Sequence, residues 1–381
     1  MTETTLRAIK YRIYPDTQQR TLIAKTIGCT RFVYNHMLAL SRDAYSRGEK
    51  FCSRNSFNYQ LTRLKQEYDW LAEVDATALT AANDHLASAF RSFFDRRAGF
   101  PKFHKKHVSG SYTSKRIQKS NNIAVGDNYV RLPKLGLVKA KIHKAGEPDW
   151  VIKSATVSVE SDGKYYAAVT YEFERTIPQA HSIVNAIGLD YASDGLYVDD
   201  RGNVGTNHKY YRESHKKLAR EQRRLSRKRG SRKNEPKSHN YKKQLLKVNK
   251  IYSHIANQRR DNLQKISTEI ANQYDIVCVE SLNMRSMANK GFGNGKATLD
   301  NGYGLFLNML AYKLADRGKY FVKVDKWFPS SQICHACGAI HPEMKDLKIR
   351  TMKCDCGLSV SRDQNAAINI KNEGLRMLKA S

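Results

Sequence analysis

The sequence predicts an α+β protein of several domains, because its hydrophobic spacing changes along 381 residues from helical to β-type and then alternates. Apolar residues recur at helical spacing in 15–107, and short β-type runs fill 108–180. From about 181 onward, strand-like apolar runs alternate with helical segments, which is typical of an α/β domain. A chain of this length is expected to hold two or three domains with cores of their own.

The N-terminal residues predict one strand followed by a helical block. Ile9, Tyr11 and Ile13 alternate with basic residues, which favours a half-buried strand over 1–14. Asp16, with Gln19 three residues later, predicts a capping box at the start of a helix. Further helices are expected over 56–71 and 77–97.

Three acidic residues stand where elements end or begin. Asp190 ends an apolar run, Glu280 ends the β-type run 275–280, and Asp363 begins an Ala/Ile-rich helix. Carboxylates are the ligands that hard Mg²⁺ prefers. Two such ions, roughly 3.5–4 Å apart, can activate water and stabilise a leaving oxygen in phosphodiester cleavage. The sequence therefore predicts one magnesium site if the fold brings the three together.

Four of the seven cysteines predict a metal site of a different kind. Cys334-x₂-Cys337 and Cys354-x-Cys356 are separated by 16 residues, and each pair is followed by glycine. Four thiolates suit a structural zinc ribbon, and no disulfide framework is expected in an intracellular protein. The second pair is one residue shorter than usual, which leaves His335 and His341 as alternative ligands. A redox role is less favoured, because no thioredoxin-like pattern surrounds the cysteines.

The charge of the chain indicates a polyanionic partner. The net charge is +30 and the pI about 9.8, far beyond what solubility requires. The segment 209–250 holds 17 Lys or Arg against three acidic residues, with a break at 230–236 that predicts a helical hairpin. No apolar run is long enough to span a bilayer and no signal peptide is evident, so a soluble cytoplasmic protein is expected, with no membrane partner.

Motifs distributed over essentially the whole chain resemble the TnpB family, the transposon-encoded, RNA-guided RuvC-type nucleases related to type V CRISPR effectors. Three of the eight carry the acidic residues, one carries Cys334 and Cys337, and four lie outside both predicted metal sites. They are GLDYASDGLYVDD (188–200), VCVESLN (277–283), SRDQNAAINI (361–370), KYRIYPDTQQ (10–19), GCTRFVYNH (28–36), RSFFDRRAGFPKF (91–103), RLPKLG (131–136) and FPSSQICHACG (328–338).

This resemblance implies a fold: a β-barrel wedge interrupted by a helical recognition lobe, then an RNase H-like (RuvC) α/β domain with an inserted zinc ribbon. The first strand is expected to join the later β-barrel, which periodicity alone does not show. The expected bounds are 1–14 (wedge, first strand), 15–107 (recognition lobe), 108–180 (wedge barrel), 181–331 (RuvC-like, with the basic insertion 209–270), 332–359 (zinc ribbon) and 360–381 (RuvC-like, C-terminal part).

The resemblance also implies an activity. It implies RNA-guided, Mg²⁺-dependent hydrolysis of DNA beside a short flanking motif, with Asp190, Glu280 and Asp363 holding two Mg²⁺ ions and the cysteines holding structural Zn²⁺. Arg362 is a candidate to contact the scissile phosphate. Asn365 either orients the carboxylates or only satisfies backbone groups in the first helical turn.

The implied partners are a guide RNA from the transposon end and double-stranded target DNA. A monomer with one RNA is expected, in a prokaryotic cytoplasm and associated with the nucleoid. Guided recognition leaves the protein to contact backbone and a flanking motif. The candidate contact residues are Tyr59, Thr77, Thr80 and Asn83 in the helical block, and Arg223, Arg224, Arg227 and Lys228 in the basic insertion.

Three alternatives stay open at this stage. They are a nuclease-inactive guided repressor, an RNA-binding or DNA-binding accessory protein of a transposase, and a transposase that joins strands. The first two are disfavoured because all three acidic residues are present. An RNase H-like core alone does not separate cutting from strand transfer.

Overall fold

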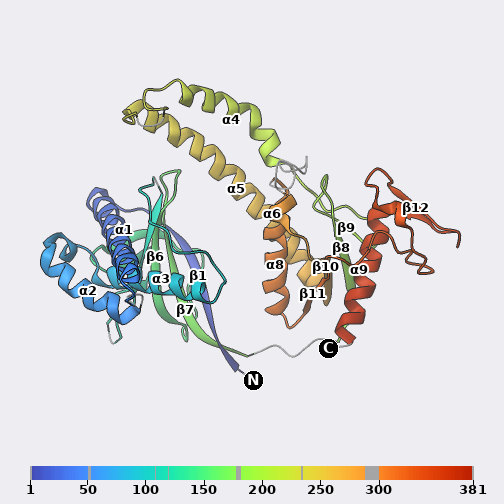
Figure 1. Ribbon diagram of the computed structural model, residues 1–381, viewed down its shortest axis with the longest axis horizontal. Helices are drawn as coiled ribbons and strands as arrows, with labels where there is room; N and C mark the ends of the chain where they lie inside the picture. Colours follow the sequence, from blue (N-terminus) through green and yellow to red (C-terminus); the bar gives the residue numbers. More distant parts are fainter. Residues whose placement is uncertain are drawn as a thin grey trace. The chain divides into compact units, whose positions relative to one another are not determined.

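The computed structural model describes residues 2–49, 53–107, 109–118, 120–176, 182–232, 235–287 and 300–379. The chain divides into two compact units, Met1–Thr176 and Ile177–Ser381 (Figure 1). Each unit has a sheet and a core of its own, so the predicted α+β class is confirmed. Among the described helices, none is long and apolar enough to cross a membrane.

Unit 1 is built on one antiparallel sheet of seven strands in the order β2-β6-β7-β1-β5-β4-β3. The first strand lies inside this sheet, paired with β7 from Thr2↔Thr176 to Ile13↔Tyr165 and with β5 at its end. The expectation that it joins the later strands is therefore confirmed, whereas closure into a barrel stays a prediction. The strands are β1 Thr2–Ile13, β2 Gly110–Lys115, β3 Ala124–Val125, β4 Tyr129–Leu132, β5 Gly136–Lys141, β6 Val151–Val159 and β7 Tyr165–Thr176.

The helices of unit 1 form a block beside this sheet. Asp16 and Gln19 make the predicted capping box at the start of α1. The predicted helix 56–71 instead ends at Glu67, because Tyr68 adopts an extended conformation, and a short 3₁₀ helix follows. The helices are α1 Thr17–Ser46, α2 Arg54–Glu67, η1 Asp69–Ala72 and α3 Ala76–Phe94.

Unit 2 is built on a smaller sheet in the order β11-β10-β8-β9. Strands β11, β10 and β8 are parallel, and β9 is antiparallel to β8. Helices α5 and α8 pack on one face of this sheet and α9 on the other. The elements are β8 Ala186–Tyr191, β9 Tyr197–Asp199, β10 Ile276–Glu280, β11 Tyr320–Val324, α6 Met284–Met287, α8 Tyr303–Ala315 and α9 Arg362–Lys379.

The basic insertion forms the predicted hairpin of two helices, α4 Tyr210–Ser226 and α5 His239–Gln273, which lie side by side (Figure 1). Leu218 of α4 is buried, and the side-chain amide of Gln244 donates hydrogen bonds to the backbone and side chain of Glu221. These contacts hold the two helices together. Basic side chains occupy much of the exposed surface of the hairpin.

The cysteine-rich segment is a small substructure with its own core. It holds a two-stranded antiparallel sheet, β12 Thr351–Lys353 and β13 Ser359–Ser361, and the short 3₁₀ helix η3 Pro342–Lys345. Met344, Met352 and Cys334 are buried together. A core with only three fully buried members is typical of small segments that a bound metal stabilises.

Candidate functional site

Strand alternation places Asp190 and Glu280 on one face of the unit 2 sheet. In β10, Val277 and Val279 pack toward α5 and α8, whereas Ile276 and Cys278 pack toward α9. Side chains alternate along a strand, so Glu280 belongs to the α9 face. The parallel register pairs Cys278 with Gly188, which puts Asp190, two residues on, level with Glu280.

Helix α9 brings the third carboxylate to the same edge. Asp363 lies in its first turn, one helical turn before Ala367. Ala367 packs against the backbone of β8 at Gly188, where a Cβ would overlap its carbonyl oxygen. Further along, Gly374 lies against Cys278 in the same way. Small residues at these contacts therefore let α9 approach the sheet closely and carry Asp363 to the ends of β8 and β10.

The three carboxylates line one cleft of about 790 Å³. Each is partly exposed, so each can reach a ligand. Arg362 and Arg350 line the same cleft, and the Arg362 guanidinium is close enough to Asp190 to favour its ionised form. The structure thus brings together all three predicted acidic residues and the predicted arginine.

The electrostatics of this cleft indicate a shortage of positive charge. Burial, with Asp363 and then Glu280 nearby, raises the pKa of Asp190 to about 8. Burial also raises the pKa of Glu280. A carboxyl that stays protonated near neutral pH because of burial and neighbouring carboxylates gains most from a bound cation. The donor set, three carboxylates from separate elements, fits a hard divalent metal ion.

Asn365 hydrogen-bonds to backbone groups of the cysteine-rich segment, which neither of its two predicted roles named. It is fully buried, and its Nδ2 donates to the carbonyl of Ile333 at 2.8 Å. Its Oδ1 accepts a hydrogen bond from the backbone nitrogen of His335 at 3.2 Å. Asn369 adds similar bonds to Ser330 and Ile333. These amides fasten the cysteine-rich segment to α9.

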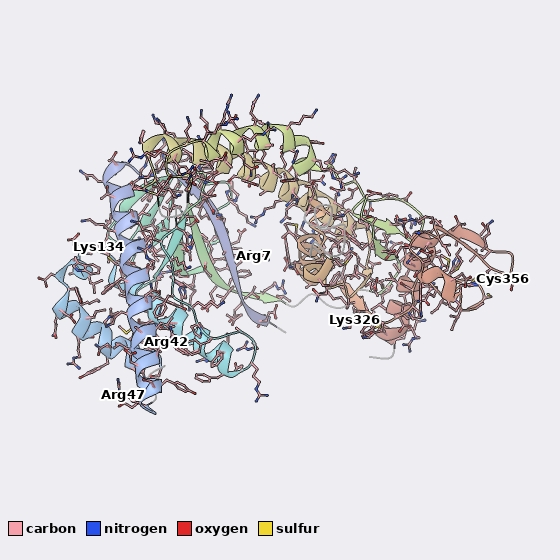
Figure 2. The ribbon with its side chains drawn as sticks, turned by 45° about the horizontal axis from the view of Figure 1, so that its top comes forward. Arg7, Arg42, Arg47, Lys134, Lys326 and Cys356 are labelled. Atoms are coloured by element: carbon pink, nitrogen blue, oxygen red, sulfur yellow. The ribbon has the colours of Figure 1, made fainter. Side chains whose placement is uncertain are left out.

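Sequence reasoning missed Trp327 and Lys326 in the cleft and Tyr303 near its carboxylates. Trp327 is 79% exposed on its wall, and Lys326 lies beside it with its Nζ 4.7 Å from the Trp327 ring centroid (Figure 2 labels Lys326). Tyr303 is 1% exposed, its hydroxyl has no hydrogen-bond partner in the described structure, and Asp190 and Glu280 lie near enough to raise its pKa further. The run KWFPSSQ (326–332) could have indicated Trp327, because it places an aromatic residue between a lysine and a turn-forming Pro-Ser-Ser segment.

The four cysteines come together as predicted (Figure 2 labels Cys356). Their sulfurs all lie within 4.8 Å of one another, with Cys334–Cys356 at 3.7 Å and Cys337–Cys354 at 3.5 Å. Zn–S bonds of about 2.3 Å in a tetrahedron require sulfurs about 3.8 Å apart. The short Cys-x-Cys pair is therefore compatible with zinc geometry. The alternative ligand His335 is hydrogen-bonded to Asn365 instead.

The residues predicted to contact nucleic acid in unit 1 differ in accessibility. Tyr59 is 70% exposed on α2. Thr77 bonds to the Asp75 carboxylate, and the Thr80 hydroxyl donates to the Thr77 carbonyl. Asn83 is fully buried and donates to Asn58 of α2. Asn83 thus connects α3 to α2, and its role in contacting nucleic acid stays a prediction.

The four predicted contact residues of the hairpin lie at the end of α4 and just beyond it. Arg223, Arg224, Arg227 and Lys228 are all exposed, and Figure 2 shows nitrogen atoms at the tips of side chains along the hairpin. Arg224 also pairs with Glu221 at 2.8 Å.

Comparison with known families covers most of the chain. The family OrfB of IS605, described as "Probable transposase", matches residues 158–291. The Cas12f1-like TNB domain matches 303–370, which contains the four cysteines. A domain described as helix-turn-helix matches 1–50. Over 2–49, however, the structure has one strand and one helix.

Full-length relatives carry consistent names. A protein of Streptomyces pristinaespiralis named "Putative RNA-guided DNA endonuclease" is 32% identical over 97% of this chain and 89% of its own length. The Escherichia coli K12 protein "Putative RNA-guided DNA endonuclease InsQ" is 29% identical over 98% and 93%. The Cas12f1 fold, solved in a Cas12f1-sgRNA-target DNA complex, matches at a TM-score of 0.63 with 13% identity, over 97% of this chain and 99% of that one. The chain belongs to the TnpB family.

Proposed function

We propose that this protein is an RNA-guided DNA endonuclease that hydrolyses phosphodiester bonds beside a short flanking motif. The observation that carries the proposal is the convergence of Asp190, Glu280 and Asp363 in one cleft. The names of the two full-length relatives support the same activity. Guide RNA from the transposon end and double-stranded target DNA are the proposed partners, with one RNA per protein monomer.

Asp190, Glu280 and Asp363 would hold Mg²⁺ in this proposal. Bound there, two Mg²⁺ ions supply an activated water and neutralise charge on the leaving oxygen. The protein fixes the ligands on two strand ends and one helix, which is a rigid support for a catalytic site. Arg362, which lines the cleft, would contact the phosphate, and Trp327 and Lys326 would offer an aromatic and basic wall for the strand.

We also propose roles for the other parts of the chain. We assign the unit 1 sheet to a barrel wedge, 15–107 to a recognition lobe, and the unit 2 sheet with its helices to an RNase H-like RuvC domain. Base pairing with the guide would select sequence, and the protein would contact backbone and flanking motif. Zn²⁺ held by Cys334, Cys337, Cys354 and Cys356 would stabilise the ribbon, which contributes Leu347 and Arg350 to the cleft.

Cleavage by carboxylate variants tests the chemical part of the proposal. Asp190→Ala, Glu280→Ala and Asp363→Ala are each expected to abolish cleavage and leave target binding nearly unchanged, with non-additive effects because they form one site. Asp194→Ala is the matched control, since Asp194 lines the same cleft but is 93% exposed. A triad variant that retains near-normal cleavage removes that residue from the site.

RNA content tests the guided part. The protein purified from its native host is expected to carry an RNA of uniform end, and changing the targeting segment of that RNA should redirect the cut. Mass measurement of the complex checks the one-to-one stoichiometry. Equal cutting of one target by RNA-free protein would exclude guidance and leave an unguided nuclease.

A further inference from the structure

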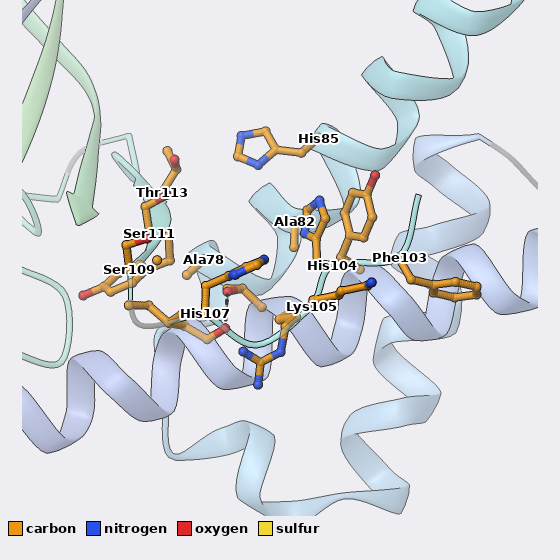
Figure 3. Close-up of a pocket in the computed structure, with 16 residues that line it drawn as sticks. Ala78, Ala82, His85, Phe103, His104, Lys105, His107, Ser109, Ser111 and Thr113 are labelled. Atoms are coloured by element: carbon orange, nitrogen blue, oxygen red, sulfur yellow. Dashed lines mark hydrogen bonds between the residues drawn. The ribbon is translucent and has the colours of Figure 1, made fainter. Parts of the chain in front are cut away.

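Unit 1 contains a cavity of about 470 Å³. The residues that line it are distant in sequence from those assigned above to metal binding or cleavage. It lies between α1, α3 and the segment that leads from 103 into β2 (Figure 3). Its size falls within the range of small-ligand pockets. Small side chains, Ala78 and Ala82, form its floor on α3.

The lining of this cavity carries two permanent cations, Arg31 and Lys105, and three histidines. Arg31 comes from α1, His85 from α3, and His104, Lys105 and His107 from the following segment; Figure 3 shows the last four around the space. The lining residues include no Asp or Glu. Throughout the described part of the chain, no carboxylate lies within ion-pair distance of Arg31 or Lys105.

The cavity wall is fixed in place before any ligand binds. The His104 ring stacks on Tyr34, with ring centroids 3.9 Å apart and planes 8° from parallel. Two hydrogen bonds hold the backbone of His104: its N–H donates to Oδ1 of Asn35 at 2.8 Å, and Nδ2 of Asn35 donates to its carbonyl at 3.0 Å. A preorganised wall reduces the ordering cost of binding.

The charges around His104 are unbalanced. Its pKa is lowered by burial first and then by the positive charges of His85 and Arg31. The carboxylate of Asp75 is near enough to affect Tyr112 of the lining, yet it is buried and accepts hydrogen bonds from Thr77. Cationic groups that converge without a counter-ion attract an anion, and hydroxyls of Ser111 and Thr113 offer further donors.

We propose that this cavity binds a phosphate group of a nucleic-acid strand, held by Arg31 and Lys105 with the histidines as additional donors. The site is separate in sequence from the carboxylate cleft and from the basic hairpin. The proposal deepens the proposed function, on which it rests for the identity of the anion. A phosphodiester of RNA and one of duplex DNA present the same chemistry to the cavity, so the test uses both.

The test compares two charge-matched double variants of the full-length protein. Arg31→Gln with Lys105→Gln removes the two permanent cations of the cavity. Arg131→Gln with Lys139→Gln removes one arginine and one lysine from exposed positions on β4 and β5 of the same unit. Circular dichroism and thermal unfolding check that both variants fold.

Fluorescence anisotropy measures binding of labelled single-stranded RNA and of duplex DNA over a range of salt concentrations. The cavity variant is expected to bind one of the two about tenfold more weakly, with a salt slope smaller by one to two, about 0.7–0.9 per lost phosphate contact. The control variant, Arg131→Gln with Lys139→Gln, should keep the wild-type affinity and salt slope. The strand whose binding falls identifies the source of the phosphate.

A second readout does not depend on affinity alone. The C2 proton of His104, assigned by comparison with His104→Gln, reports the pKa of the ring by NMR. Binding of the responsive strand should raise that pKa in the wild type, because the phosphate offsets the charges of Arg31 and His85. Unchanged affinity, salt slope and His104 titration would overturn the proposal, while loss of cleavage in the Asp190 variant would still stand.

Discussion

The carbonyl oxygen of Ala367 in α9 occupies the space that a side chain at Gly188 of β8 would need. A Cβ built at Gly188 overlaps this oxygen and lies 2.9 Å from the backbone nitrogen of Lys371. Asp190 follows Gly188 by two residues, and Asp363 precedes Ala367 by one helical turn. This single contact therefore sets how closely the two carboxylates approach.

Gly188→Ala is expected to damage both stability and cleavage. The clash is with backbone, which cannot rotate away, so α9 must move off the sheet at a cost of about 1–3 kcal/mol. Displacement of Asp363 should reduce cleavage by orders of magnitude, because a shift of about 1 Å at a catalytic group can cost about a hundredfold. Thermal unfolding and a cleavage assay measure the two effects.

Gly28→Ala is the matched control for that substitution. Gly28 lies inside α1, and a Cβ there meets no atom within 4 Å. Alanine is favoured over glycine in helices by up to about 1 kcal/mol, so this variant should be neutral or more stable. Full cleavage by Gly188→Ala would show that the close approach of α9 does not position the site.

Asp190 should make the metal-free protein less stable as pH rises. Its folded pKa is about 8 against a usual value of 3.8, so the protonated form is favoured in the folded state. The associated stability is complete below about pH 4 and is lost progressively as pH rises toward 8. Asp190→Asn lacks this loss, and its melting temperature in EDTA should exceed that of the wild type increasingly from pH 5 to pH 8.

Magnesium should reverse this order, because only the wild type gains from a cation bound to the full carboxylate set. At pH 8, added Mg²⁺ should raise the melting temperature of the wild type and leave that of Asp190→Asn nearly unchanged. Parallel pH profiles for the two proteins in EDTA would contradict the electrostatic account. Differential scanning fluorimetry at each pH provides the measurement.

The double variant Cys337→Ser, Cys354→Ser should lose one tightly bound zinc per chain. Metal and local folding are coupled, and Met344 and Met352 form too small a core to hold the segment alone. Elemental analysis measures the metal, and limited proteolysis should cut within 332–359 only in the variant. Cys29→Ala, in the helical core of unit 1, should retain zinc. A zinc-free wild type that resists proteolysis there would refute the site.

The carboxylates were predictable because strand ends and a helix start are visible in apolar runs. That they lie on one face of the sheet was not predictable. Alternate residues of β8 and β10 can be assigned to a common face only when the register, which pairs Cys278 with Gly188, is known. Asn365 shows a different limit. Its position two residues after Asp363 allows a role at the metal or in the first helical turn, yet its side chain bonds to Ile333 and His335. Only tertiary packing decides between two partners that are equally polar.

The cavity in unit 1 was beyond sequence reasoning for a similar reason. Arg31, His85 and Lys105 belong to three separate segments, and each alone resembles an ordinary surface cation. Asn83 gives the converse case, because a polar residue on a helix looks accessible until the partner helix covers it. The helical hairpin, in contrast, was predicted in full, since its spacing and its break are local features.

Removing the charge from the end of α4 should weaken RNA retention without affecting the chemistry. Replacing Arg223, Arg224, Arg227 and Lys228 with Ala should reduce the salt slope of RNA binding by about three, because each neutralised phosphate releases condensed counterions. Arg224 already pairs with Glu221, so Arg224→Ala alone should cost less than Arg223→Ala. A variant with Arg63, Arg91, Arg116 and Lys134 replaced removes the same charge from exposed positions in unit 1. If both quadruple variants lose RNA equally, the hairpin contributes only through net charge. A second test supplies guide RNA in excess to the hairpin variant. Restored cleavage would show that the defect lies in assembly and that the carboxylates are intact.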